Sequence, residues 1–148
     1  MFRLLLDVDG PLAGFNTHFW NRATEVGYYF DIAEYEMQNK RYITDHIVHS
    51  HRTQARKLVE QTGWFRELPV VPGSQEGVQR LETLGVDIWL CTKPLEENPT
   101  CRDEKGAWVA EHFPKYLKKL IITPDKSLIK GDILLDDAPK PDWFPISE

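Results

Sequence analysis

Two aspartates stand close together near the start of the chain, in the sequence Asp7-Val-Asp9-Gly10. They directly follow residues 2–6, which are apolar apart from Arg3 and are typical of a buried strand. Side chains two positions apart on a strand point to the same side, so the two carboxylates repel each other unless a cation or a proton lies between them. The pair therefore indicates a metal ion or a shared proton.

Three later apolar runs also end at residues that can bind a ligand or a metal. These are Thr92 after residues 86–91, Lys126 just past residues 120–123, and Asp136 with Asp137 after residues 133–135. With the first two aspartates they supply carboxylates, a hydroxyl and an ammonium group, the set that binds a divalent cation and a phosphate together. Oxygen ligands without thiolate or imidazole favour Mg²⁺ over zinc.

Apolar runs and helical periodicity alternate along the chain. Strands are predicted at residues 2–6, 86–92, 120–123 and 133–136, and helices at 11–26, 49–61, 74–84 and 103–113, with Ser74 and Asp103 capping the last two. This alternation predicts an α/β fold with a Rossmann-like parallel sheet and right-handed crossovers. Because the carboxyl ends of parallel strands meet at one edge, we expect the polar residues at the strand ends to form one site.

Composition limits the classes of partner. The 148 residues, 41% of them hydrophobic, fit one globular domain with room for a small inserted subdomain. The net charge of -5 argues against nucleic-acid polymers, whereas a small phosphorylated ligand depends only on the local field. No apolar run approaches the roughly 20 residues of a membrane span, no signal peptide is evident, and Cys91 and Cys101 are predicted to be free thiols. We therefore expect a cytoplasmic protein without membrane contact, and a homodimer is compatible with the sequence.

Four motifs give the chain a resemblance to the haloacid dehalogenase superfamily of phosphohydrolases. In order, they are Asp7-Val-Asp9-Gly10, Thr92 after Ile88-Trp89-Leu90-Cys91, Lys126 in Thr123-Pro124-Asp125-Lys126, and Asp136-Asp137. Within the superfamily the chain looks like a 5'(3')-deoxyribonucleotidase. That narrower resemblance rests on Asp9-Gly10-Pro11-Leu12-Ala13 with Phe15, Phe65-Arg66-Glu67-Leu68 before Pro72-Gly73, Cys91-Thr92-Lys93-Pro94-Leu95, and Glu104-Lys105 before Ala107-Trp108-Val109. It covers nearly the whole chain.

The resemblance implies a fold and an activity. The fold is a three-layer sandwich in which residues 1–15 and 68–148 form the catalytic core and residues 16–67 form a small helical cap, inserted after the first motif. The activity is Mg²⁺-dependent hydrolysis of (deoxy)ribonucleoside 5'- or 3'-monophosphates through an aspartyl-phosphate.

The resemblance also implies a role for each site residue. Asp7 would be the nucleophile, and Asp9 the general acid and base. Phosphate would be bound by Thr92, Lys105, Lys126 and the backbone N–H groups of Gly10 and Lys93. Mg²⁺ would be held by Asp7, the Asp9 carbonyl oxygen and Asp137, with Asp136 supporting its waters, an assignment in which Asp136 and Asp137 are interchangeable. The nucleobase would lie near Phe15, Tyr42, Ile43 and Trp64.

Other functions are compatible with parts of the pattern. The nearest is a phosphatase of the same superfamily that acts on another small phosphate ester. A phospho-accepting receiver also gathers acids, a threonine and a lysine at strand ends, but its acceptor aspartate lies on a strand between the acidic pair and the threonine. Here the predicted strand 86–91 leads directly to Thr92, which disfavours a receiver. The third alternative is an inactive nucleotide-binding module.

Some features of the cap and of the chain end have a plainer interpretation. The cap aromatics can simply form its core. His46, His49 and His51 fit a solvated group at the substrate rim better than a zinc site, because no cysteine or Glu-x-x-His pattern accompanies them. Residues 138–148 show no strand pattern where the family continues into another strand, so we expect either a minimal version of the fold or a chain that stops early, with an exposed sheet edge in the second case.

Overall fold

Four parallel strands form the sheet of the computed structural model, which describes residues 1–31 and 43–137. The strands are β1 (Arg3–Leu6), β2 (Asp87–Thr92), β3 (Leu120–Ile122) and β4 (Ile133–Leu135), in the order β3-β2-β1-β4 across the sheet. β1 therefore lies in the interior, hydrogen-bonded to β2 on one side and to β4 on the other. The predicted α/β fold with a parallel sheet is confirmed.

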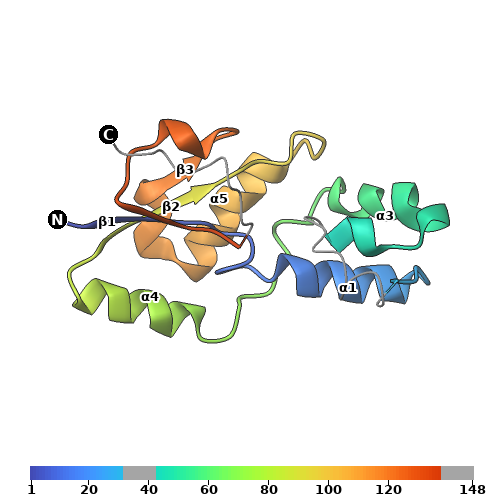
Figure 1. The fold of residues 1–148 in the computed structure, drawn as a ribbon, viewed down its shortest axis with the longest axis horizontal. Helices are drawn as coiled ribbons and strands as arrows, with labels where there is room; N and C mark the ends of the chain where they lie inside the picture. Colours follow the sequence, from blue (N-terminus) through green and yellow to red (C-terminus); the bar gives the residue numbers. More distant parts are fainter. Residues whose placement is uncertain (32–42, 138–148) are drawn as a thin grey trace.

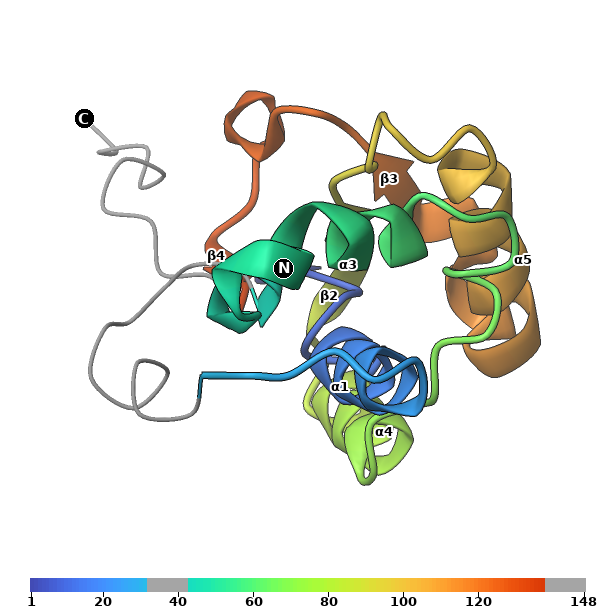
Figure 2. The same cartoon turned by 90° about the vertical axis from the view of Figure 1, so that its right-hand side faces the viewer.

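Two helices connect the strands on one face of the sheet. α4 (Ser74–Thr83) leads into β2, and α5 (Cys101–His112) leads towards β3. Both connections run in the same direction across the sheet, so right-handed crossovers place both helices on the same face, as Figure 2 shows. The chain returns from β3 to β4 across the opposite face through residues 123–132.

Two further helices lie beyond the carboxyl ends of the strands (Figure 1). They are α1 (Phe15–Glu25) and α3 (Arg52–Val59), which pack against each other, and α3 follows 3-10 turns at Ile43–His46 and His49–His51. α3 and all of α1 except Phe15 fall within the predicted cap, whose boundaries at residues 16 and 67 stay a prediction. Within the parts of the chain that the structure describes, no helix is both long enough and apolar enough to cross a membrane.

The core is built from alternate residues of the central strands. Leu4 and Leu6 of β1 are paired in register with Ile88 and Leu90 of β2, and all four belong to one buried cluster with Trp108 of α5. Side chains on a strand alternate between faces, so Leu5 points away from this cluster. On that side Gly131 comes so close that a Cβ there would lie 2.6 Å from Leu5 Cγ. The approach of Gly131 keeps the Leu5 face covered just before β4 begins.

Several predicted helix ends are wrong. α1 begins at Phe15 instead of residue 11, because the N–H groups of Leu12 and Ala13 both donate to the Val8 carbonyl and form a tight turn there. The residue that caps α4 is Gly73, whose φ of 82° turns the chain, and not Ser74. Likewise α5 is capped by the residue before Cys101, so Asp103 lies inside its first turn.

Asp87, at the amino-terminal end of β2, ties three elements together. Its carboxylate accepts a hydrogen bond from Lys119 Nζ at 2.8 Å, from Arg3 Nε at 2.9 Å and from Trp89 Nε1 at 3.2 Å. The hydrogen bonds from Lys119 and then Arg3 lower the pKa of Asp87 to about 2. This carboxylate therefore links β1, β2 and the segment before β3.

Replacing Asp87 by asparagine is expected to destabilise the fold in a pH-dependent way. A folded-state pKa below the ordinary 3.8 stabilises the protein above that value, and this contribution disappears as the pH falls towards about 2. Thermal unfolding at about pH 7 should show Asp87→Asn melting a few degrees below wild type, with the gap narrowing towards about pH 3. Glu97→Gln, at an exposed loop position, is the control. A gap that stays constant with pH would contradict the ion-pair account.

Candidate active site

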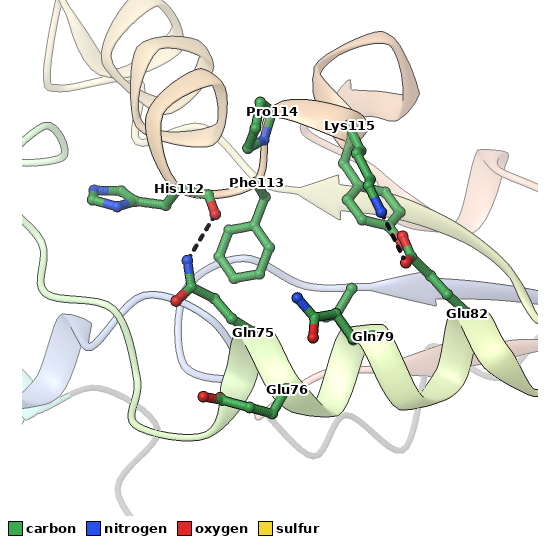
Figure 3. A pocket seen from close by; sticks show the side chains of 10 residues that line it. Gln75, Glu76, Gln79, Glu82, His112, Phe113, Pro114 and Lys115 are labelled. Carbon is green, nitrogen blue, oxygen red and sulfur yellow. Dashed lines mark hydrogen bonds and ion pairs between the residues drawn. The ribbon is translucent and has the colours of Figure 1, made fainter.

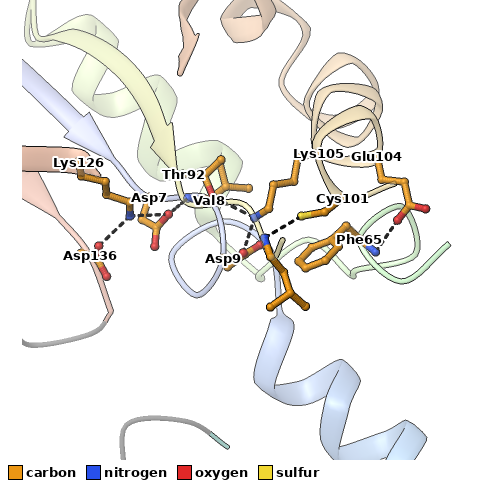
Figure 4. A network of polar contacts seen from close by, with 11 residues as sticks. Asp7, Val8, Asp9, Phe65, Thr92, Cys101, Glu104, Lys105, Lys126 and Asp136 are labelled. Carbon is orange, nitrogen blue, oxygen red and sulfur yellow. Dashed lines mark hydrogen bonds and ion pairs between the residues drawn. The ribbon is translucent and has the colours of Figure 1, made fainter. Parts of the chain in front are cut away.

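A buried carboxylate at the end of β1 is ion-paired to a buried lysine. Asp7 directly follows β1, and its Oδ1 lies 2.8 Å from Lys126 Nζ (Figure 4). The same ammonium lies 2.8 Å from Asp136 Oδ2, and the Lys126 side chain is only 2% exposed. Asp7 Oδ1 also accepts the Val8 N–H at 2.8 Å. The connection from β3 to β4 thus places a cation between two of the predicted acids.

Burial and neighbouring charges shift the pKa values of Asp7, Lys126 and Asp137. Burial raises the pKa of Asp7 to about 6, although Lys126 favours its charged form. Burial alone would lower the pKa of Lys126, but Asp7 and Asp136 outweigh it and raise that pKa, so the ammonium stays charged. Burial, with the nearby Asp136 and Asp9 carboxylates, also raises the pKa of Asp137. Burial thus disfavours the charged forms of Asp7 and Asp137, and a cation bound between them would stabilise those charged forms.

A second lysine joins Asp9 to the end of β2. Lys105 Nζ donates to Asp9 Oδ2 at 2.5 Å and to Thr92 Oγ1 at 3.0 Å, and its side chain is 2% exposed. Asp9 Oδ1 is buried and has no hydrogen-bond partner within residues 1–31 and 43–137. One Asp9 oxygen is therefore held by the lysine, and the other is left for a ligand.

Three carboxylates come close enough to share a metal ion. Asp7, Asp136 and Asp137 each offer one oxygen, and these oxygens lie within 4.8 Å of one another. A group of hard oxygen ligands of this kind suits Mg²⁺. His46, His49 and His51 form no comparable group in the part of the chain that the structure describes.

Gly10 lets Asp137 approach the end of β1. Its φ is +97°, and a Cβ at this position would lie 2.2 Å from Asp137 Oδ2 and 2.3 Å from Asp137 Cγ. Its N–H, predicted to bind phosphate, instead donates to the Ala13 carbonyl at 2.8 Å. In this conformation position 10 needs the small size and the backbone angles of glycine, and its role as a phosphate donor stays a prediction.

The predicted base-pocket residues are only partly brought together. The ring centroids of Phe15 and Trp64 lie 5.8 Å apart, but Trp64 is 5% exposed and also packs on Phe19. Ile43 is buried in the same apolar cluster. Tyr42 lies outside the described residues. Core packing thus accounts for Trp64 and Ile43 in this conformation, and their contact with a base stays a prediction.

Two residues lie at the site although their spacing predicts no role for them. The Phe65 ring centroid is 4.7 Å from Lys105 Nζ, and Glu104 accepts the Phe65 N–H at 3.0 Å. Both residues belong to motifs that carry the family resemblance, and Glu104 also precedes Lys105 and stands four residues before Trp108, on the buried side of α5. The Lys93 side chain, by contrast, is exposed. Binding of phosphate by the Lys93 backbone N–H stays a prediction.

A separate hollow of about 350 Å³ lies between α4 and residues 112–116 (Figure 3). Gln75 Nε2 donates to the His112 carbonyl at 2.9 Å across it, and the Tyr116 hydroxyl donates to Glu82 at 2.5 Å. None of the carboxylates or lysines at the strand ends lines it. It therefore does not belong to the candidate active site.

Known proteins similar to the chain identify its family. The family described as 5' nucleotidase, deoxy (pyrimidine), cytosolic type C protein matches residues 1–141. The chain is 34% identical over 137 residues to a Bordetella pertussis protein provisionally named a 5'(3')-deoxyribonucleotidase, which covers 92% of this chain and 74% of that protein. It is 31% identical over 144 residues to the mouse mitochondrial 5'(3')-deoxyribonucleotidase (93% of this chain, 64% of that one). It is 35% identical over 82 residues to the human cytosolic-type enzyme (54% and 41%). The chain therefore belongs to this 5'-nucleotidase family, within the haloacid dehalogenase superfamily of phosphohydrolases.

Proposed function

We propose that this protein hydrolyses (deoxy)ribonucleoside 5'- or 3'-monophosphates, with Asp7 as the nucleophile and Asp9 as the general acid and base. The observation that carries the proposal is that each of these two carboxylates is bound by its own buried lysine, Asp7 by Lys126 and Asp9 by Lys105. Phosphoryl transfer depends mainly on positioning and on neutralising charge, which two ammonium groups can supply. The names of the relatives support nucleoside monophosphates as the substrate class.

In the first half of the reaction, an ionised Asp7 oxygen forms a bond to phosphorus while the ester P–O bond breaks. Asp9 starts this half in its protonated form, with the proton on the Oδ1 that Lys105 does not hold, and gives that proton to the leaving alkoxide. Lys126 and the Val8 N–H both hold Asp7 Oδ1, which fixes the orientation of the nucleophile. The product of this half-reaction is an aspartyl-phosphate and a free nucleoside.

In the second half, water attacks the phosphorus of the aspartyl-phosphate. Asp9 now accepts a proton from that water, and the Asp7–phosphorus bond breaks to release inorganic phosphate. Lys105 and Thr92, which are in contact at 3.0 Å, would bind phosphate oxygens in both halves. Asp9 returns to its protonated form and Asp7 to its ionised form, so the cycle closes.

The acidic cluster fits Mg²⁺. Asp7, Asp136 and Asp137 would hold the ion, with the Asp9 carbonyl oxygen as a further ligand. The convergence of three carboxylate oxygens and the close approach of Asp137 over Gly10 support this assignment. When bound, Mg²⁺ would neutralise negative charge on the phosphate oxygens and on Asp7.

A substrate panel tests the proposal. Phosphate release is measured from 5'- and 3'-deoxyribonucleotides, ribonucleotides and sugar phosphates, with Mg²⁺ and after chelation. We expect kcat/KM for at least one deoxyribonucleoside monophosphate to exceed that for every sugar phosphate by about tenfold or more. Activity should disappear on chelation and return with Mg²⁺. Faster turnover of sugar phosphates would show that the substrate is another small phosphate ester and not a nucleotide. If no compound released phosphate, the phosphatase assignment would be overturned.

A further inference from the structure

Glu104 is a buried carboxylate that the proposed mechanism does not use. It lies in the first turn of α5 and is 9% exposed. Its two oxygens accept hydrogen bonds from the Gly63 N–H at 2.6 Å, the Phe65 N–H at 3.0 Å and the Thr100 hydroxyl at 2.5 Å. A buried charge is costly unless it is hydrogen-bonded in this way, so Glu104 binds the segment that follows α3 strongly.

These donors keep Glu104 ionised. Burial alone would raise its pKa, but the hydrogen bonds from Thr100, Gly63 and Phe65 outweigh burial and hold that pKa below its ordinary value. The two backbone N–H groups belong to residues 39 and 41 positions earlier in the chain. The Glu104 carboxylate thus does more than place a negative charge in the first turn of its own helix. It also bonds the predicted cap to α5.

Phe65 is held on both sides by neighbouring residues of α5 (Figure 4). Glu104 accepts its N–H, and the Lys105 ammonium lies 4.7 Å from its ring centroid. An ammonium over an aromatic face is attracted to it, more strongly where water is excluded. The same ammonium contacts Asp9 and Thr92, so the Phe65 ring forms one wall of the space that Lys105 occupies.

The stretch of chain around Phe65 is fixed at its ends by other residues. Asn98 Nδ2 donates to the Val59 and Gln61 carbonyls, both at 2.9 Å, and Trp108 Nε1 donates to the Leu68 carbonyl at 2.7 Å. Removing the Glu104 charge should therefore displace Phe65 locally and leave the cap attached.

We propose that Glu104 is a positioning residue, which holds Phe65 against the Lys105 ammonium and thereby sets the contacts of Lys105 with Asp9 and Thr92 during turnover. The inference rests on the proposed function. Glutamine is nearly the same size as glutamate, but only one of its two terminal atoms accepts a hydrogen bond, so one backbone N–H at residue 63 or 65 loses its partner.

A double-mutant cycle tests the proposal. Glu104→Gln, Lys105→Met and the double variant are compared with wild type for kcat, KM and inhibition by inorganic phosphate. We expect Glu104→Gln to lower kcat about tenfold and to weaken phosphate inhibition, as a small displacement at a reacting centre does. The double variant should be no slower than Lys105→Met alone, because Glu104 acts through that lysine. Asp103→Asn, an exposed carboxylate in the same helical turn, is the control and should keep wild-type kinetics.

If Glu104→Gln does not fold, Phe65→Leu is tested in its place, because it removes the ring from Lys105 and keeps the backbone N–H. This variant should also lower kcat. In the Lys105→Met background it should lower kcat no further. Multiplicative losses, or wild-type kcat and phosphate inhibition in Glu104→Gln, would overturn the positioning role while leaving the proposed function standing. Failure of the wild-type protein to hydrolyse any phosphate ester would instead overturn the proposed function and this inference with it.

Discussion

The Asp7→Asn variant is expected to lose turnover by at least about 10³-fold while remaining folded. The amide has nearly the shape of the carboxylate, but its oxygen is a poor nucleophile and cannot form a stable acyl phosphate. Lys126 still has Asp136 at 2.8 Å, so the loss of one carboxylate does not leave its ammonium without an anionic partner. Initial rates of phosphate release on the best substrate, with thermal unfolding as a check of the fold, measure the effect.

The neighbouring variant Asp9→Asn separates the nucleophile from the general acid. An aryl phosphate such as p-nitrophenyl phosphate needs little protonation of its leaving group, so Asp9→Asn should still form the aspartyl-phosphate and then hydrolyse it slowly. Asp7→Asn should form none. Mass spectrometry of acid-quenched protein detects the intermediate. Phosphate on the Asp7→Asn protein, or turnover close to that of wild type, would place the nucleophile on another residue.

The strand ends could be predicted from the sequence because burial leaves a strong pattern. A central parallel strand is apolar along its length, so Asp7 after β1 and Thr92 at the end of β2 stand out against their neighbours. Parallel topology then places them at one edge, and the structure brings Asp7 to the same lysine as Asp136. The apolar pattern and the parallel topology were therefore sufficient to predict that these strand-end residues lie at one edge of the sheet.

Helix ends were less predictable, because they depend on local backbone geometry. Ser74 and Asp103 are good capping residues in isolation, yet the turn at Gly73 starts α4 one residue earlier than the side-chain preference suggests. Similarly, the helical spacing from residue 11 continues into α1, but the tight turn on the Val8 carbonyl occupies the first residues. Periodicity reports which side chains face the core and does not report where the helix begins.

Contacts between distant segments left almost no trace in the sequence. Nothing in the spacing of Glu104 shows that it accepts the N–H groups of Gly63 and Phe65, because that depends on how the chain returns from the predicted cap to α5. Gly10 is a similar case. Its place in the first motif suggests a phosphate donor, and only the approach of Asp137 from the far end of the described chain shows why a side chain does not fit.

We expect Gly10→Ala to weaken Mg²⁺ binding and the activity that depends on it. The effect should exceed that of adding one methyl group anywhere else at the site. The new Cβ would collide with the Asp137 carboxylate, whose Oδ2 lies 2.2 Å and whose Cβ lies 2.7 Å from its position. Asp137 must therefore move away from Asp7 and Asp136. We expect the Mg²⁺ concentration for half-maximal activity to rise roughly tenfold or more, and kcat/KM to fall. The increase in unfolding temperature on adding Mg²⁺ should shrink as well, which measures the ion without relying on activity.

Gly73→Ala is the control for Gly10→Ala, because it introduces backbone strain without a collision. Gly73 has a φ of +82°, close to the +97° of Gly10, but a Cβ there would meet nothing within 4 Å. Both alanine variants should lose roughly 1–3 kcal/mol of stability, because L side chains rarely adopt such angles. Only Gly10→Ala should also respond more weakly to Mg²⁺. Equal Mg²⁺ responses in the two variants would show that Asp137 does not help to hold the ion, and would leave Asp7 and Asp136 as its carboxylate ligands.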